Sequence, residues 1–88
     1  MNILQMAIYN ELLDIEAENV KAHREPTHAL LIRDKVWERV EQRLGYELVW
    51  SEFYKALQML DLESKIRLGD TIRDQYAAIV YKDFNSSL

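Results

Sequence analysis

The stretch Asp61–Val80, DLESKIRLGDTIRDQYAAIV, decides how many helices the chain is predicted to contain. Its apolar residues continue at helical spacing past Gly69, and they are Leu62, Ile66, Ile72, Tyr76, Ile79 and Val80. One glycine inside a helix costs only about 1 kcal/mol relative to alanine, so Gly69 does not have to end it. The segment is therefore predicted to be helical, with a turn near Asp61 preferred over a division at Gly69.

Outward from this stretch, helix-breaking residues are sparse along the whole chain. Pro26, Gly45 and Gly69 are the only prolines and glycines among 88 residues, and they leave four helix-sized pieces, 1–25, 27–44, 46–68 and 70–88. A chain of this length forms one domain. The prediction is a single all-α domain over residues 1–88, a compact bundle of four or five short helices.

The helix boundaries are predicted from capping residues. The first helix is expected from Asn2 or Ile3 to His23, and the second over about 28–44. We expect N-caps at Thr27 and Ser51, and a left-handed C-terminal residue at Gly45. Residues 46–50 are interpreted as a loop or helical turn, and residues 85–88 as a frayed end.

The first helix is apolar on most of its sides. Leu4, Ile8, Leu12 and Ile15 form one stripe, and Tyr9, Leu13, Ala17 and Val20 form a second stripe beside it. Such a helix is either central in its bundle or packs on something outside it. A self-associating module would use the first stripe, and an Ile8→Glu change should then disrupt the dimer, although the same change could unfold the chain under either hypothesis.

Charge is distributed unevenly along a chain of net charge −4. The first 20 residues contain no lysine or arginine, and their acids are Glu11, Asp14, Glu16 and Glu18. An acidic helix could attract a basic protein partner. The alternative is an ordinary solvated face. Lysine replacements should abolish binding by an acidic inhibitor and leave a self-associating module folded.

Trp50 and Tyr54 are the aromatic residues with the best claim to a binding patch. They lie four positions apart and off the line of Phe53, Leu57 and Leu60. Tyrosine and tryptophan dominate binding hot spots. Filling the core is the alternative role for both.

Nucleic-acid binding is the rival function. Lys35, Arg39 and Arg43 recur every four residues, and short helices with tight turns can form a helix-turn-helix. Acidic residues interrupt this row, however, and a phosphate-binding surface needs uncompensated positive charge.

No chemistry-bearing motif is recognised. His23, Glu25 and His28 gather at the first turn, but Pro26 breaks the helix that would align them, so we expect no metal site and no cofactor. The chain has no cysteine, no glycine-rich phosphate loop, no signal peptide and no membrane-length apolar run. A cytoplasmic protein that is not an enzyme is predicted.

These observations favour a small non-catalytic protein–protein interaction module. It would act as a regulator, inhibitor or adaptor, as a partner of a basic protein or as a homodimer. The alternative is a helix-turn-helix-like regulator that binds nucleic acid through the basic row.

Overall fold

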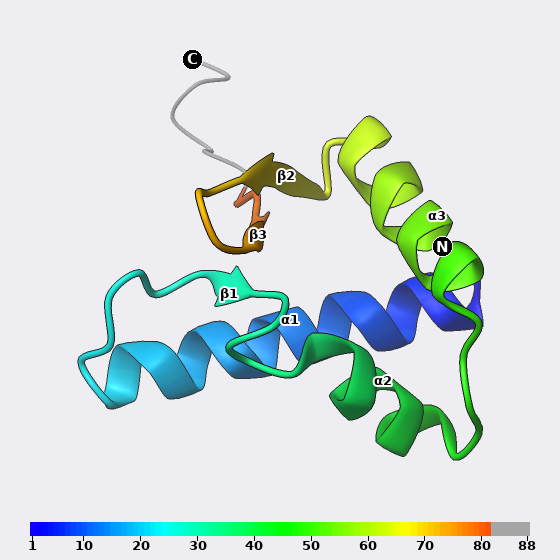
Figure 1. The fold of residues 1–88 in the computed structure, drawn as a ribbon. Coiled ribbons are helices and arrows are strands. Elements are labelled where there is room, and N and C mark those ends of the chain that lie inside the picture. The colour runs from blue at the N-terminus through cyan, green and yellow to red at the C-terminus, as the bar shows by residue number, and fades with distance from the viewer. Residues whose placement is uncertain (82–88) are drawn as a thin grey trace.

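A computed structural model describes residues 1–81 and shows an α+β fold rather than an all-α bundle. Three helices accompany a three-stranded antiparallel sheet (Figure 1). The elements in chain order are α1 (Ile3–Lys21), β1 (Ala29–Leu30), α2 (Val36–Leu44), α3 (Trp50–Leu62), β2 (Ile66–Asp70) and β3 (Gln75–Ile79). The predicted bundle of four or five helices is therefore wrong, and residues 85–88 lie outside the described part of the chain.

Both ends of helix α1 lie within two residues of the predicted boundaries. The helix is central in the fold. Asn2 and Gln5 form a capping box, in which the Asn2 side chain accepts a hydrogen bond from the Gln5 N–H at 2.8 Å. The helix contacts α2, α3, β1 and β3, so its apolar sides are covered from several directions. Ile8, Leu12 and Ile15 are each at most 1% exposed. The apolar residues on most sides of α1 are therefore explained by its central position in the fold.

The predicted second helix begins eight residues too early. Residues 29–30 form β1, residues 31–35 form turns, and α2 starts only at Val36, so Thr27 is not its N-cap. Lys35, which precedes α2, has the left-handed conformation at φ 52°. The pairing partner of β1 is β3, far along the chain, and local sequence spacing does not reveal such a contact. The left-handed residue predicted at Gly45 is confirmed, with φ 83°.

Helix α3 is followed by a hairpin where the sequence predicts more helix. Val49, not Ser51, is the N-cap of α3, and the chain turns through Ser64 at φ 61°. On β2, Ile66 is buried and Leu68 half-buried, with exposed Arg67 between them. This spacing of two residues is typical of a strand, and a search for apolar residues at helical spacing does not detect it. Gly69 and the Asp-Thr pair that follows are weak helix formers, and Thr71 bonds to Asp74 across the turn instead.

The hydrogen-bond register shows which backbone groups of the sheet remain free. At one end of the hairpin Val80 N–H donates to Lys65 C=O, and at the other Thr71 N–H donates to Asp74 C=O. Along an antiparallel ladder, residue pairs that exchange backbone hydrogen bonds alternate with pairs that do not. Because residues 65 and 71 bond across the hairpin, the odd-numbered residues of β2 between them also bond to β3. The backbone groups of Ile66, Leu68 and Asp70 therefore point away from β3.

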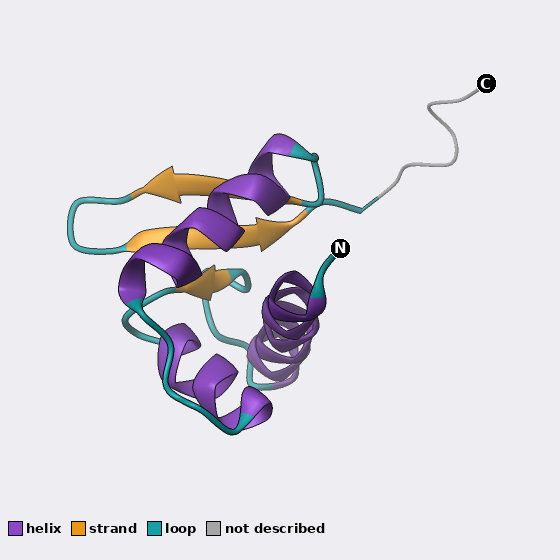
Figure 2. Cartoon of the chain, turned by 90° about the vertical axis from the view of Figure 1, so that its right-hand side faces the viewer, coloured by secondary structure: helices purple, strands orange, loops and turns teal. Residues whose placement is uncertain are grey.

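The sheet order is β1-β3-β2, with α3 lying across the β2–β3 hairpin in Figure 2. Side chains from every helix and strand join one buried apolar cluster. Its largest members, all less than 2% exposed, are Phe53, Ile8, Leu12, Ile15, Leu57, Leu60, Ile66, Val36 and Val40. This arrangement buries the first-helix stripe that self-association was expected to use.

Candidate functional site

Acidic residues of α1 and basic residues of α2 face each other across the contact between the two helices, where Glu11 is the buried member of the set. Glu11 accepts hydrogen bonds at 2.7 Å from the Nε atoms of both Arg39 and Arg43. Arg39 reaches Glu18 at 2.7 Å, and Arg43 reaches Asp14 at 2.7 Å. Two sets of residues predicted as alternative binding surfaces thus form one ion-pair network between α1 and α2.

Two predicted site residues lie outside this network. Glu16 accepts a hydrogen bond at 3.0 Å from the Tyr81 hydroxyl, and Lys35 is exposed without an ion-pair partner among the described residues. With Arg39 and Arg43 already matched by carboxylates, the basic row offers little uncompensated charge to a phosphate backbone.

The carboxylates of this network have altered pKa values. Burial raises the pKa of Glu11, but hydrogen bonds from Arg43 and Arg39 outweigh it, so the pKa lies below its ordinary value. The hydrogen bond from Arg39 likewise lowers the pKa of Glu18. Both groups therefore favour the charged form in the folded state.

We expect the fold to lose stability in acid because of these shifts. A depressed folded-state pKa contributes stability that is present above the unfolded-state pKa and is lost as pH falls through the folded value. Urea unfolding between pH 7 and pH 3 should show the free energy of unfolding falling below about pH 5. A Glu11→Gln variant should have a shallower pH dependence, and an equally steep one would contradict the assignment to Glu11.

The apolar site residues predicted on the first helix are core residues. Ile8 is 0% and Leu12 is 1% exposed, while Leu4 is half-buried against the same cluster. Ile8 and Leu12 are therefore not accessible to a second molecule in this fold. An Ile8→Glu variant would therefore report loss of the core rather than loss of a dimer.

Trp50 and Tyr54 do lie at the surface, within an aromatic cluster. The rings of Trp50 and Tyr54 stack at 5.7 Å, and Trp50 meets the edge of Trp37 at 5.3 Å and tilts against Phe53 at 5.5 Å. Trp50 is 44% exposed and Tyr54 is half-buried, whereas Phe53 is fully buried. The cluster connects the core to the solvent through Trp50.

Two adjoining hollows meet at Trp50. The smaller, about 140 Å³, is lined mainly by the apolar side chains of Leu31, Ile32, Trp37, Trp50 and Phe53. The larger, about 380 Å³, shares the first two and Trp50 and continues along the turn between β2 and β3. We name these two hollows together the Trp50 groove.

Two exposed isoleucines differ in their relation to the Trp50 groove: Ile32 lines both hollows, whereas Ile72 lines neither. Ile32 is 74% exposed, and Ile72 at the hairpin turn is fully exposed. Both fall within segments predicted to be helical, Ile32 in the second helix over about 28–44 and Ile72 in the segment 61–80, and neither was predicted as a surface residue. Ile72 lies between Thr71 and Arg73, among turn-forming aspartates 70 and 74, and that local composition was the signal available for a turn.

The hairpin turn is tied to this groove by Asp74. Its carboxylate accepts hydrogen bonds from the backbone N–H groups of Ile32 and Arg33, at 3.0 and 3.1 Å. One wall of the groove is thereby held against the other. The Trp37 Nε1 beneath it is buried and has no acceptor among the described residues.

The two histidines do not form part of a metal site in residues 1–81. In that range, no three His, Cys, Asp or Glu side chains lie close enough together to hold a metal ion. His28 instead packs its ring against Tyr76 at 4.9 Å. In the same part of the chain, none of the helices combines the length and apolar character that crossing a membrane requires.

Comparisons with known proteins identify no relative. No protein-family model matches the chain, and no curated protein or solved structure is significantly similar to it.

Proposed function

We propose that this chain is a small non-catalytic module that binds another protein through the Trp50 groove. The observation that carries the proposal is Trp50 itself, a large aromatic side chain 44% exposed at the meeting point of two hollows. Tryptophan and tyrosine are enriched among the residues that dominate protein interfaces. The roles that we propose for it are those of a regulator, inhibitor or adaptor.

The shape of the groove indicates what the partner inserts. An apolar cavity of about 150 Å³ accepts a benzene-sized group, and the smaller hollow has a volume of about 140 Å³. One aromatic or large aliphatic side chain of the partner fits this space. The charges around it, Lys35 and Glu38, have opposite signs, so apolar contact rather than net charge would supply the affinity.

A cytoplasmic location is part of the same proposal. The chain has no cysteine, which agrees with a reducing compartment.

The test compares partner capture by wild-type and Trp50→Ala chains. Tagged chains are incubated with lysate, with and without nuclease, and the captured proteins are then purified and titrated directly by calorimetry. We expect Trp50→Ala to weaken binding by about 2 kcal/mol or more, roughly thirtyfold in affinity. Leu62→Ala is the matched control, since Leu62 is 77% exposed and does not line the groove.

Two results would contradict the proposal. Equal capture by the Trp50→Ala and Leu62→Ala chains would exclude the groove as the contact surface. Partners that disappear on nuclease treatment would instead support the nucleic-acid alternative through Lys35, Arg39 and Arg43.

A further inference from the structure

The Trp50 groove continues into a third hollow between α3 and β2. This hollow has a volume of about 190 Å³, and we name it the Tyr54 hollow. Asp70 and Gln75 line both the Tyr54 hollow and the larger hollow of the groove. Its aromatic member, Tyr54, stacks on Trp50 at 5.7 Å. A protein segment that binds at Trp50 therefore lies beside the Tyr54 hollow as well.

The Tyr54 hollow is acidic. Among the described residues, its lining contains two carboxylates, Asp61 from α3 and Asp70 from β2, and no lysine, arginine or histidine. Both aspartates are exposed, and neither has an ion-pair partner in residues 1–81. Arg67 on β2 alternates with Leu68, so its side chain points to the other face of the sheet. Two negative charges are thus uncompensated beside the groove.

Hydrogen bonds position these two carboxylates and leave one oxygen of each free. The Gln75 Nε2 group donates to the Tyr54 hydroxyl oxygen at 3.0 Å and to Asp70 Oδ1 at 2.9 Å. Asp61 Oδ1 accepts from the Leu68 N–H at 3.3 Å. The Oδ2 atom of each aspartate has no donor within the described part of the chain. An ammonium or guanidinium group would supply the donors that these oxygens lack.

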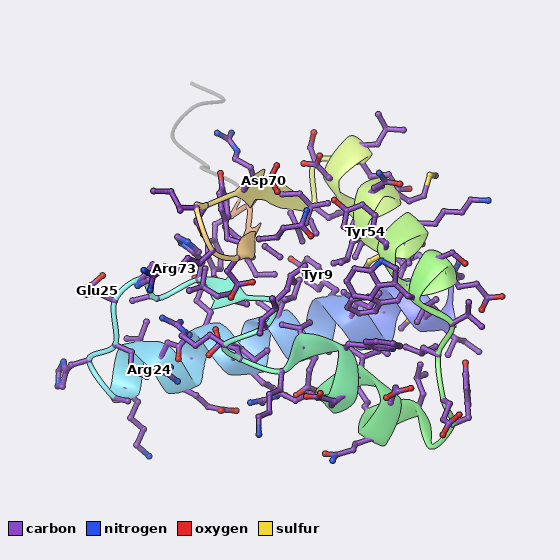
Figure 3. All side chains as sticks on the ribbon, viewed as in Figure 1. Tyr9, Arg24, Glu25, Tyr54, Asp70 and Arg73 are labelled. Carbon is purple, nitrogen blue, oxygen red and sulfur yellow. The ribbon has the colours of Figure 1, made fainter. Side chains whose placement is uncertain are left out.

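The nearest basic residue of the hairpin lies on the far side of Asp70. In Figure 3, Tyr54 on α3 and Arg73 at the hairpin turn lie on opposite sides of Asp70. Arg73 lines the larger hollow of the groove but not the Tyr54 hollow. A cation that enters the Tyr54 hollow therefore meets two carboxylates and a half-buried tyrosine ring, and no like charge from its lining.

We propose that the protein segment that binds the Trp50 groove carries an arginine or lysine close to its apolar side chain, and that this basic side chain occupies the Tyr54 hollow. The inference rests on the proposed function, because the apolar side chain anchors the segment. Charge complementarity argues for this occupant. Four acidic and two basic side chains line the three hollows, and the excess of acid is concentrated at Asp61 and Asp70. Arginine fits best, since its planar guanidinium pairs with a carboxylate through two hydrogen bonds and stacks on aromatic rings.

The basic side chain contributes selectivity more than affinity. Asp61 and Asp70 are exposed, so each ion pair is weakened by solvent and by salt. We expect removal of both charges to weaken binding of a basic segment about five- to tenfold. This is less than the roughly thirtyfold loss expected for Trp50→Ala.

Peptide selection by the full chain tests the proposal without knowledge of the natural partner. A random library of phage-displayed peptides is panned against the immobilised chain, and the enriched sequences are read. We expect them to combine an aromatic or large aliphatic residue with a nearby arginine or lysine. Panning against the double variant Asp61→Asn/Asp70→Asn should keep the apolar residue and lose the excess of basic residues.

Asparagine is the conservative replacement at both positions. Its side-chain oxygen can still accept from the Leu68 N–H and from Gln75 Nε2, so the charges are removed and the hydrogen bonds kept. The matched control is the double variant Glu47→Gln/Glu63→Gln, because both glutamates are exposed and neither lines any of the three hollows. Each double variant removes two negative charges, so a difference between them depends on where the charges lie. Circular dichroism and thermal unfolding check that both remain folded.

An enriched peptide is then titrated into each chain by calorimetry, at about 50 and 500 mM salt. Wild type should bind it about five- to tenfold more tightly than Asp61→Asn/Asp70→Asn at low salt, and the difference should shrink at high salt. The control double variant should bind the peptide like wild type. Three results would overturn the proposal: no enriched peptide, enriched peptides without an excess of basic residues, or equal binding by the two double variants.

The same measurements separate this inference from the proposed function. Peptides that depend on Trp50 but not on Asp61 and Asp70 would keep the groove as the binding surface and exclude the basic side chain. Peptides that bind Trp50→Ala as tightly as wild type would contradict the proposed function itself. Self-association of the free chain that Trp50→Ala abolishes, measured by sedimentation velocity, would assign the groove to a second copy and overturn the basic segment.

Discussion

Glu11→Lys should destabilise the fold by about 3–5 kcal/mol, the cost of leaving buried charge without its partner. The Glu11 side chain is 9% exposed and holds the guanidinium groups of both Arg39 and Arg43 at 2.7 Å. Lysine at this position places a third cation against two arginines. Thermal unfolding should show the effect as a midpoint roughly 12 °C or more below wild type.

The control is Glu16→Lys on the same helix. Glu16 contacts the Tyr81 hydroxyl and takes no part in the network with Arg39, so the change in unfolding free energy should stay within about 0.5 kcal/mol. Glu11→Leu should cost less than Glu11→Lys, because each arginine keeps a second carboxylate, Glu18 or Asp14. A Glu11→Lys chain as stable as the Glu16→Lys chain would show that the network is not formed in solution.

The contribution of Glu11 to the stability of the fold also changes how binding by the acidic helix has to be tested. The sequence predicts that lysine replacement at all four acids abolishes an electrostatic contact and leaves a self-associating module folded. Because Glu11 and Glu18 support the fold, such a variant would lose binding simply by unfolding. Glu16→Lys is the informative replacement on this helix.

Proline at Arg67 and at Asp70 should have very different effects on stability. The Arg67 N–H bonds inward to β3, so Arg67→Pro breaks the ladder and should cost about 2–4 kcal/mol. The Asp70 N–H faces outward, so Asp70→Pro should cost within about 1 kcal/mol, chiefly the bond from Gln75 to the Asp70 carboxylate. Urea unfolding of the two variants measures the difference.

The same pair distinguishes the hairpin from the predicted helix. Inside a helix, proline costs about 3 kcal/mol at either position. Equal destabilisation by Arg67→Pro and Asp70→Pro would therefore restore the helical interpretation of residues 62–80. Arg67→Ala is the matched control for loss of the side chain, and it should remain close to wild type because Arg67 is exposed.

The parts of the fold that depend on neighbouring residues were predictable from the sequence. Helix α1 and the turn at Gly45 follow from capping and spacing, and both were located within two residues. The sheet was not predictable in this way. β1 is only two residues long and its partner is distant, and the apolar residues of 62–80 fit helical spacing as well as alternation.

In the candidate site, too, the features that depend on neighbouring residues were predictable and those that depend on distant contacts were not. Trp50 was recognised as a surface candidate because it lies off the apolar line of its own helix. The pairing of Glu11 with Arg39 and Arg43 was missed because sequence shows charge type but not which helix faces carry the charges. Ile32 and Ile72 were missed because their positions depend on turns that the helical interpretation excluded.

The pairing of Ala29 with Ala77 has a consequence for how the chain reaches this structure. These residues are separated by more than half of the chain, yet their strands lie side by side. Contacts between residues so far apart in sequence slow folding. The chain loses the conformational entropy of the intervening loop before the contact contributes any stabilising free energy. During synthesis α1, α2 and α3 are all made before residue 77, so β1 has no strand to bond to until β3 emerges. The sheet is therefore the last part of the core that can be completed.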